Sequence, residues 1–391
     1  MQVGLRIVAL VAAALASAPL AGCEDATPAP EVHGATAALA MEGLSADETA
    51  QFIFGRSEFL ETESAAAGIG PLFNGTSCAG CHASQGVGGP GVVTVARAAC
   101  KGPDGSLSDP PGGSLIFLFS TRPEVASANV PAHCQTIARR RTTNVLGLGL
   151  IEAIPDEAIM AAAQEPKPAG VLGRAAMVLD AKSKVMRVGR FGWKSQHATL
   201  DVFAADAYRN EMGITNDIFP TENAPGGNVE MLKLMDPTPD PEARLGVVPA
   251  LASFMRFSTA PVSAPLTPEM AAGAALFTSV GCASCHRTSY QTGSQVSPAL
   301  ANQTVRLYSD LLLHDVGTGD SIVQGAATGA EFRTPPLWGL SRNVGLMHDG
   351  RAGGVADAIA DHAGEASGVK AAYLALSDAE RQQLILFVSG L

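Results

Sequence analysis

The sequence has few aromatic residues, a deficit of positive charge and no long apolar run near its start. Aromatic side chains make up 5% of the 391 residues although 47% are hydrophobic, so a bulky group other than a side chain is expected to help fill the core. Lysine and arginine total 26 against 37 acidic residues, a net charge of -11, which argues against a nucleic-acid partner. Length and hydrophobic content favour two folded domains over a disordered chain or a fibre.

The first apolar run, Ile7 to Leu20 after Arg6, is too short to span a bilayer and is typical of the core of a signal peptide. The run leads into Leu20-Ala21-Gly22-Cys23, which resembles a bacterial lipobox, where the cysteine becomes a lipid-modified N-terminus. We therefore expect a lipoprotein signal peptide at 1–22, a flexible tether at 23–41 and a membrane anchor at Cys23. The expected location is the periplasm or cell envelope. An ordinary secretory peptide is the alternative.

Cysteine is scarce, and four of the seven cysteines lie in two identical patterns. These are Cys78-Ala79-Gly80-Cys81-His82, the first haem motif, and Cys282-Ala283-Ser284-Cys285-His286, the second haem motif. The spacing lets two thiols bond to the vinyl groups on one edge of a haem while the histidine lies beneath the iron. We predict two covalently bound haem c groups, with His82 and His286 as iron ligands. A zinc pair or thioredoxin-like dithiols would not explain a histidine directly after both motifs.

Two cysteines, Cys100 and Cys134, remain once Cys23 and the haem motifs are assigned. Because an exported chain reaches an oxidising compartment, elimination favours a disulfide between them.

A weak internal repeat precedes the two motifs. A helix beginning at the capping box Ser45 to Glu48 carries Gly55 and Phe59, and a helix opened by Thr267 carries Gly273 and Phe277 at the same spacing. Another capping box, Ser377 to Glu380, opens a closing helix that should bury Leu384, Phe387 and Val388. The repeat resembles the cytochrome c fold, present twice.

The expected fold is mainly α, with two cytochrome c-like haem domains. The proline-rich stretch 236–241 cannot form a helix and reads as a linker, so we place an N-terminal domain at 42–240 and a C-terminal domain at 241–391. The first domain is enlarged by loops and short strands, including a predicted buried strand at 115–119. The run Arg139-Arg140-Arg141 either pairs with haem propionates or is a solvated charge run.

The sixth iron ligand separates an electron carrier from a reactive site. In Met347-His348-Asp349-Gly350-Arg351 two candidate ligands are adjacent on a predicted tight turn, and we expect Met347 or His348 to complete the second haem. Further candidates in the sequence are His133, His197, His314, His362, Met255 and Met270. No short-range ligand follows the first haem motif, which suggests an open first iron, unless His197 or Met186 folds over it.

Several stretches together resemble the bacterial di-haem oxidoreductases known as peroxidases or thiol oxidoreductases, more distant relatives of the di-haem cytochrome c peroxidases. The matching stretches are 73–77 (Phe-Asn-Gly-Thr-Ser), 189–194 (Gly-Arg-Phe-Gly-Trp-Lys), 308–315 (Tyr-Ser-Asp-Leu-Leu-Leu-His-Asp), 332–340 (Phe-Arg-Thr-Pro-Pro-Leu-Trp-Gly-Leu) and 348–352 (His-Asp-Gly-Arg-Ala). Two departures are Val316, where relatives often have Met, and Met347, where Leu is common.

The resemblance implies site residues around the first haem. Trp193 is the counterpart of a tryptophan between the two haems, and Glu211 is the counterpart of a distal glutamate that assists cleavage of the peroxide O–O bond. Gln196 is a further candidate for the distal pocket. A carboxyl group near an open iron can move a proton between the two peroxide oxygens. A calcium ion between the domains is left open.

The sequence thus predicts an exported di-haem c-type cytochrome oxidoreductase, peroxidase-like, with hydrogen peroxide or oxygen as oxidant. A small electron-donor protein or a quinol-linked cytochrome would supply electrons to the C-terminal haem, and the N-terminal haem would react. Two alternatives stay open. A pure electron-transfer lipoprotein would have two six-coordinate irons, and a thiol oxidoreductase would need Cys100 and Cys134 reduced and reactive.

Overall fold

A computed structural model describes residues 39–84, 86–122, 130, 133–134, 136–236, 238–343 and 345–391. The predicted signal peptide, Cys23, His33 and most of the tether predicted at 23–41 lie outside these residues. Among the described helices, none combines the length and the hydropathy that a membrane crossing needs.

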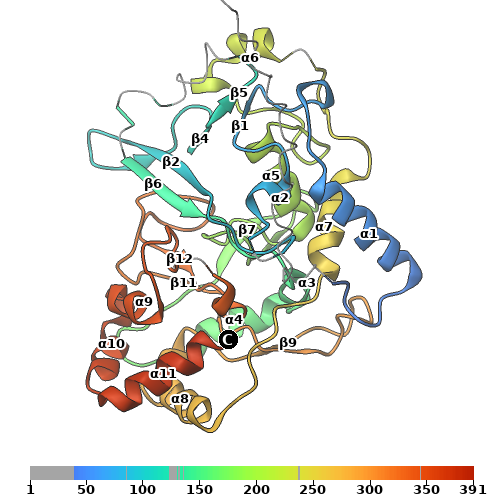
Figure 1. The fold of residues 1–391 in the computed structure, drawn as a ribbon. Coiled ribbons are helices and arrows are strands. Elements are labelled where there is room, and N and C mark those ends of the chain that lie inside the picture. The colour runs from blue at the N-terminus through green and yellow to red at the C-terminus, as the bar shows by residue number, and fades with distance from the viewer. Residues whose placement is uncertain are drawn as a thin grey trace, which may run out of the picture. The chain divides into compact units, whose positions relative to one another are not determined.

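The described part of the chain contains eleven α-helices and twelve short β-strands (Figure 1). The helices are α1 Ala46–Leu60, α2 Cys78–Cys81, α3 Leu148–Glu152, α4 Asp156–Gln164, α5 Leu200–Met212, α6 Val229–Met235, α7 Val247–Phe257, α8 Pro268–Ser279, α9 Val355–Asp361, α10 Ser367–Leu374 and α11 Asp378–Ser389. The strands are β1 Leu72–Phe73, β2 Thr94–Lys101, β3 Leu107–Ser108, β4 Leu115–Ile116, β5 Phe119–Ser120, β6 Thr136–Arg141, β7 Ala176–Leu179, β8 Met186–Gly189, β9 Tyr290–Gln291, β10 Thr304–Val305, β11 Leu313–His314 and β12 Phe332–Arg333.

Each haem motif is preceded by a helix that crosses a second helix at a glycine. The predicted capping box at Ser45 starts α1, and a Cβ on Gly55 would lie 1.9 Å from the carbonyl oxygen of Ala250 in α7. Likewise, Thr267 caps α8, and a Cβ on Gly273 would lie 2.1 Å from the carbonyl oxygen of Gln383 in α11. The glycines of the repeat are therefore explained by close helix packing (Figure 1). The capping box at Ser377 is also confirmed.

The packing of α7 differs from the predicted domain division. The boundary at 240 assigns α7 to the C-terminal domain, yet α7 packs against α1 and α5. The reason is the close crossing at Gly55, whose nearest neighbours Ala250 and Phe254 lie in α7, and the apolar side chains of α7, most of which are buried. By its contacts, α7 completes the helices around the first haem motif, in the way that α11 does around the second. The other predicted domain limits stay predictions.

The described strands form small, separate antiparallel sheets, and β2 is the central strand of the four-stranded one. This strand pairs with β3, β4 and β6, and it carries Cys100, which forms the predicted disulfide with Cys134. The single buried strand predicted at 115–119 is wrong. The segment instead contributes two short strands, β4 and β5, to different sheets, and Phe119 is 51% exposed.

Two main apolar cores hold the helices together. The larger core includes Phe52, Phe59 and Phe254, and it also takes in Leu307 and Leu312 from the segment after the second haem motif. The smaller core is built on α8 and α11 and includes Phe277, Leu384, Phe387 and Val388, so burial of the predicted face of α11 is confirmed. Because buried residues from Tyr290 to Leu312 contribute to the larger core, the segments around both motifs are packed as one unit.

Candidate functional site

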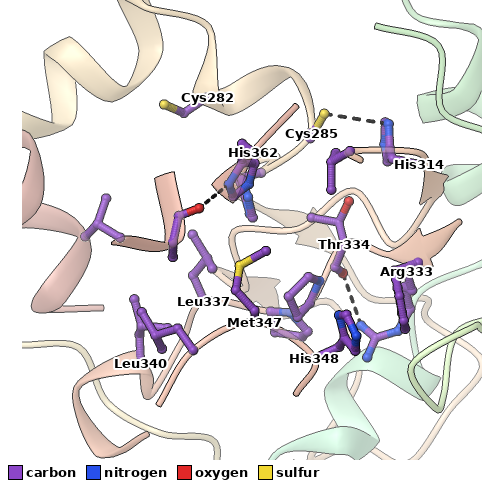
Figure 2. Close-up of a pocket in the computed structure, with 18 of the residues that line it drawn as sticks. Cys282, Cys285, His314, Arg333, Thr334, Leu337, Leu340, Met347, His348 and His362 are labelled. Carbon is purple, nitrogen blue, oxygen red and sulfur yellow. Dashed lines mark hydrogen bonds between the residues drawn. The ribbon is translucent and has the colours of Figure 1, made fainter. Parts of the chain in front are cut away.

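The two haem motifs have the same local geometry. None of the thiols of Cys78, Cys81, Cys282 and Cys285 is in a disulfide, and Sγ of Cys285 lies 3.7 Å from Nδ1 of His314 (Figure 2). In both motifs the main-chain N–H of the histidine donates to the main-chain carbonyl oxygen of the first cysteine. The distance is 3.0 Å for His82 and 2.9 Å for His286. Each short turn therefore presents two free thiols and a histidine, the donor set that a covalently held haem requires.

Each motif histidine is oriented through one ring nitrogen. Nδ1 of His82 donates to the carbonyl oxygen of Thr143 at 2.9 Å, and Nδ1 of His286 donates to that of Tyr308 at 3.1 Å. Because a carbonyl can only accept, the proton lies on Nδ1 and the lone pair on Nε2 is available to a metal. Burial lowers the pKa of both histidines to about 4. Both rings are therefore neutral, as an iron ligand must be.

The phenylalanines of the repeat lie beside these rings. The ring centroids of Phe59 and His82 are 6.1 Å apart, and those of Phe277 and His286 are 6.3 Å apart. The Gly-x-x-x-Phe spacing therefore has two structural reasons. The glycine allows two helices to cross, and the phenylalanine one turn later packs against the candidate iron ligand.

An apolar cavity of about 260 Å³ opens beside the second haem motif (Figure 2). Its walls include Cys282, Cys285 and His286, together with residues from both parts of the chain. Those from the N-terminal part include Arg141, Thr143, Ile151, Phe191 and Trp193, and those from the C-terminal part include Phe332, Arg333, Leu337, Trp338, Met347, His348, His362 and Tyr373. A large apolar wall with a few polar groups fits a porphyrin.

Both candidates for the sixth ligand of the second haem, Met347 and His348, line this cavity. Met347 has a φ of 67°, a left-handed conformation that is unusual for a non-glycine residue, and the turn continues through Gly350 as predicted. His348 is buried, and burial lowers its pKa to about 4. The structure therefore brings both candidates to the cavity.

His314 is not available as a ligand, because both of its ring nitrogens are engaged. Nδ1 lies 2.8 Å from Glu365 and Nε2 lies 2.9 Å from Asp310. Burial lowers the pKa of His314, but the hydrogen bond with Asp310 and its other partners outweigh burial and raise the pKa to about 11. Since both nitrogens carry protons, the ring has no lone pair for iron.

Most other sequence candidates also lie away from an open coordination position. Met186 is 53% exposed on β8, and Met270 is buried in the smaller core. Met255 is buried in the larger core, and Nε2 of His197 lies 3.0 Å from Asp206. His133 lies beside the disulfide cysteines. His362, by contrast, lines the cavity, with Nδ1 2.6 Å from the carbonyl oxygen of Ala358.

Trp193 lines the cavity and contacts other residues of its wall. Its ring centroid is 6.4 Å from that of His348 and 6.2 Å from that of Phe332, edge-on in both cases. Its indole N–H donates to the carbonyl oxygen of Arg141 at 3.1 Å. The structure therefore brings Trp193 together with His348, one of the candidate ligands.

The three arginines at 139–141, at the end of β6, have different environments. Arg139 is exposed. Arg140 is buried and pairs with Asp320 at 2.7 Å. Arg141 is 8% exposed and lines the cavity, and its Nε and Nη1 have no partner among the described residues. Of the two readings of this run, propionate pairing therefore fits Arg141 alone, because an unpaired buried guanidinium requires an anion.

A buried ion cluster behind His348 was missed by the sequence analysis. Lys194 is fully buried and lies 3.1 Å from Asp320, which also pairs with Arg140. The Lys194 ammonium lies 4.3 Å from the ring centroid of Phe332, and Phe332 stacks on His348 with centroids 4.3 Å apart. Lys194 belongs to a stretch quoted for the family resemblance, but nothing in the sequence marked Asp320.

Glu211 lies near the end of α5, beside the first haem motif. Its carboxyl group accepts a hydrogen bond from Nδ2 of Asn74 at 3.1 Å, and its charge raises the pKa of the Cys81 thiol, although burial raises it more. Burial raises the pKa of Glu211, and Arg97 and Asn74 oppose that effect. Glu211 is half-buried and has a raised pKa, so it differs from a fully solvated helix-end side chain and suits proton transfer.

Gln196 has contacts within its own turn. Its Oε1 accepts a hydrogen bond from the main-chain N–H of Lys194 at 3.3 Å. A Cβ on Gly192, which has a φ of 79°, would lie 2.2 Å from the Gln196 carboxamide. The assignment of Gln196 to the distal pocket stays a prediction.

Four carboxyl groups outside the haem motifs form an acidic cluster. Ligand atoms of Glu222, Asp236, Asp240 and Glu242 all lie within 4.8 Å of one another, and carboxylate oxygens are the ligands that calcium prefers. Burial and the neighbouring carboxylates raise the pKa of Glu222 to about 10. A shared proton therefore accounts for the cluster without an ion, and a calcium site stays a prediction.

Several solved structures are similar to the chain at low sequence identity. Hydrazine synthase from Kuenenia stuttgartiensis is 17% identical, with a TM-score of 0.42 over 99% of this chain and 100% of that one. The diheme peroxidase BthA from Burkholderia thailandensis is 14% identical, with a TM-score of 0.37 over 88% and 86%. A MauG-like protein associated with microbial copper homeostasis is 16% identical, with a TM-score of 0.32 over 63% and 89%.

No curated protein matches the chain. A family model described as "Di-haem oxidoreductase, putative peroxidase" matches residues 124–391, well over half of the sequence. This match confirms the resemblance inferred from the motifs and implies haem cofactors. The chain is a member of the di-haem oxidoreductase family.

Proposed function

We propose that this protein is an exported c-type di-haem peroxidase that holds one haem covalently at each motif. The observation that carries the proposal is the shared geometry of the motifs. Each has two unpaired thiols and a neutral histidine fixed through Nδ1. Cys78 and Cys81 would form the thioether links of the first haem with His82 as ligand, and the same three positions of the second motif would hold the second haem. When bound, the haems supply the iron that exchanges electrons and cleaves the peroxide O–O bond.

The residues around each motif support different roles for the two haems. Met347 or His348 would complete the second haem, and Arg141 would bind one of its propionates. At the first haem, Glu211 would carry a proton from the inner to the outer peroxide oxygen, which general acid–base catalysis accelerates by about 10²–10⁴-fold. Electrons would enter at the C-terminal haem and reach the first through the region of Trp193.

The cellular setting belongs to the same proposal. Cys23 would anchor the chain to a membrane in the periplasm or cell envelope. The electron donor would be a small protein or a quinol-linked cytochrome, and the oxidant hydrogen peroxide or oxygen. The disulfide between Cys100 and Cys134 supports export to an oxidising compartment. It also opposes the thiol oxidoreductase alternative, because these two cysteines are not free.

Electron paramagnetic resonance and stopped-flow spectroscopy test the proposal together. The oxidised or half-reduced protein should show a high-spin ferric signal from the first haem, whereas low-spin ferric signals alone in both states would favour a pure electron carrier. Peroxide should then react with the open haem, and Glu211→Gln should slow that reaction by about 10²-fold or more without changing haem content. Unchanged kinetics in this variant would remove Glu211 from the mechanism.

A further inference from the structure

We propose that Asn74 is a positioning residue that holds the Glu211 carboxyl group in one orientation beside the first haem motif. This inference rests on the proposed role of Glu211 as a proton carrier. In the sequence Asn74 stands out only as a member of the stretch 73–77. The structure gives it a specific contact with Glu211.

Asn74 joins the segment before the first haem motif to the end of α5. Its main-chain N–H donates to the carbonyl oxygen of Glu211 at 2.7 Å, and its side-chain Nδ2 donates to Oε2 of the same residue at 3.1 Å. Two bonds to one residue fix both the helix end and the carboxyl group. Asn74 is 7% exposed, so water competes little for these bonds.

A third bond decides which way the Asn74 amide points. The main-chain N–H of Leu118 donates to Oδ1 of Asn74 at 2.8 Å. Because an N–H group needs an acceptor, Oδ1 must face Leu118 and the NH₂ group must face Glu211. The amide therefore cannot rotate by 180° without losing both bonds, and it presents a donor to Glu211 at all times.

The backbone around Glu211 is also held in place. The helix α5 ends at Met212, and Gly213 follows with a φ of 67°. A Cβ at Gly213 would lie 2.6 Å from the carbonyl oxygen of Leu72, so the helix end lies directly against β1. With the backbone fixed, the remaining freedom of Glu211 lies in its side-chain torsions. The Asn74 bond restricts these and uses Oε2, which leaves Oε1 as the oxygen that exchanges the proton.

Such positioning has a measurable consequence because proton transfer requires hydrogen-bond distance between donor and acceptor. A carboxyl group that samples several rotamers spends less time in the productive one, and a displacement of about 1 Å can cost up to about 10²-fold in rate. We expect loss of the Asn74 bond to slow proton transfer by about tenfold, less than loss of the carboxyl group itself.

The test uses cyanide association with the ferric first haem of the full holoprotein. Hydrogen cyanide must lose its proton when it binds, so its association rate, followed in the Soret band, depends on a positioned base and does not require turnover. The variants are Asn74→Leu and Glu211→Gln, with Asn216→Leu as the matched control. Asn216 is 2% exposed and also bonds to α5, through the carbonyl oxygen of Ala205 at 2.9 Å, but not to Glu211.

The proposal predicts about tenfold slower association in Asn74→Leu, a larger loss in Glu211→Gln and an unchanged rate in Asn216→Leu. If Asn74→Leu does not fold, Asn74→Asp replaces it, because this variant keeps the acceptor for Leu118. The double variant Asn74→Asp, Glu211→Gln re-forms the bond with donor and acceptor exchanged. It should recover thermal stability but not the association rate, because it lacks the Glu211 carboxyl group, so the stability measurement separates loss of the hydrogen bond from loss of the base.

The outcomes distinguish the two proposals. If Glu211→Gln is slow while the folded Asn74 variant matches the parent, the positioning role is overturned and the proposed function stands. If the Asn74 variant and Asn216→Leu are slowed equally, Asn74 is merely structural and the inference is also overturned. If Glu211→Gln itself binds cyanide at the parent rate, both the role of Glu211 and that of Asn74 fail.

Discussion

The indole N–H of Trp193 donates to the main-chain carbonyl oxygen of Arg141 at 3.1 Å. The N–H of Arg141 in turn donates to the carbonyl oxygen of His348 at 2.8 Å. Two residues further along the chain, the carbonyl oxygen of Thr143 accepts the Nδ1 proton of His82. The main chain of residues 141–143 therefore connects His348, a candidate ligand of the second haem, with His82 of the first motif, through one hydrogen bond at each end.

Replacement of Trp193 by phenylalanine should slow electron transfer between the two haems. The change removes the indole N–H and leaves the Arg141 carbonyl unpaired, which should also cost about 1–3 kcal/mol of unfolding free energy. Transfer can be followed by reducing the second haem rapidly and recording the spectrum of the first. Trp338→Phe is the control, because the second tryptophan also lines the cavity. Equal transfer rates in the two variants would argue against a role for Trp193.

The sixth ligand of the second haem can be identified by substitution. His348→Ala should convert the low-spin absorption and resonance signals of that haem to high-spin signals if His348 is the ligand, and Met347→Leu should do so if Met347 is. His314→Gln should leave the spin state unchanged, since both ring nitrogens of His314 are bonded to carboxylates. A high-spin second haem in His314→Gln alone would contradict the assignment.

The buried ion cluster should contribute strongly to stability. Asp320 is the shared acceptor of Arg140 and Lys194, and all three side chains are almost fully buried. Asp320→Asn leaves two buried cations without a counterion, so we expect a loss of about 3–5 kcal/mol in chemical denaturation. Glu230→Gln, which breaks an exposed pair with Lys233, is the control and should cost less than about 1 kcal/mol. Similar losses in both would show that the cluster is not essential.

Acid should weaken the protein through Glu331, among other groups. Burial raises the pKa of Glu331, but its bonds with Arg174 and Thr328 outweigh burial and lower the pKa to about 2. A folded-state pKa below the unfolded value, about 4.3 for glutamate, stabilises the folded state above that pH, and this contribution is lost between about pH 4.3 and pH 2. The unfolding free energy of Glu331→Gln should therefore fall less over this interval than that of the parent. A parallel decline would mean that the pair does not form in solution.

Residues with local signals could be predicted from the sequence. Capping boxes depend on four neighbouring residues, so the starts of α1 and α11 were predicted correctly. The haem motifs are likewise local patterns, and their cysteines and histidines have the geometry that the spacing implies. The Cys100–Cys134 disulfide followed from counting cysteines.

Features that depend on tertiary contacts could not be predicted. The pairing of α1 with α7 joins segments about 200 residues apart, and Gly55 signals a close crossing without naming its partner. Arg139 faces solvent, Arg140 pairs with Asp320 and Arg141 lines the cavity, and these differences depend on the tertiary contacts of β6 rather than on the charge run itself. Asp320 and Asn74 acquire their significance only from residues distant in sequence.

Covalent attachment of two haems is the central claim, and it can be measured directly. The mature chain, produced with a working cytochrome maturation system, should be denatured and separated from non-covalently bound haem. Its intact mass is then measured by mass spectrometry, and its haem content by a pyridine haemochrome assay. We expect the mass of the polypeptide plus two haems. The double variant Cys282→Ala, Cys285→Ala should retain one covalently bound haem, and so should the double variant Cys78→Ala, Cys81→Ala. A parent chain that carries fewer than two haems after denaturation would contradict the account.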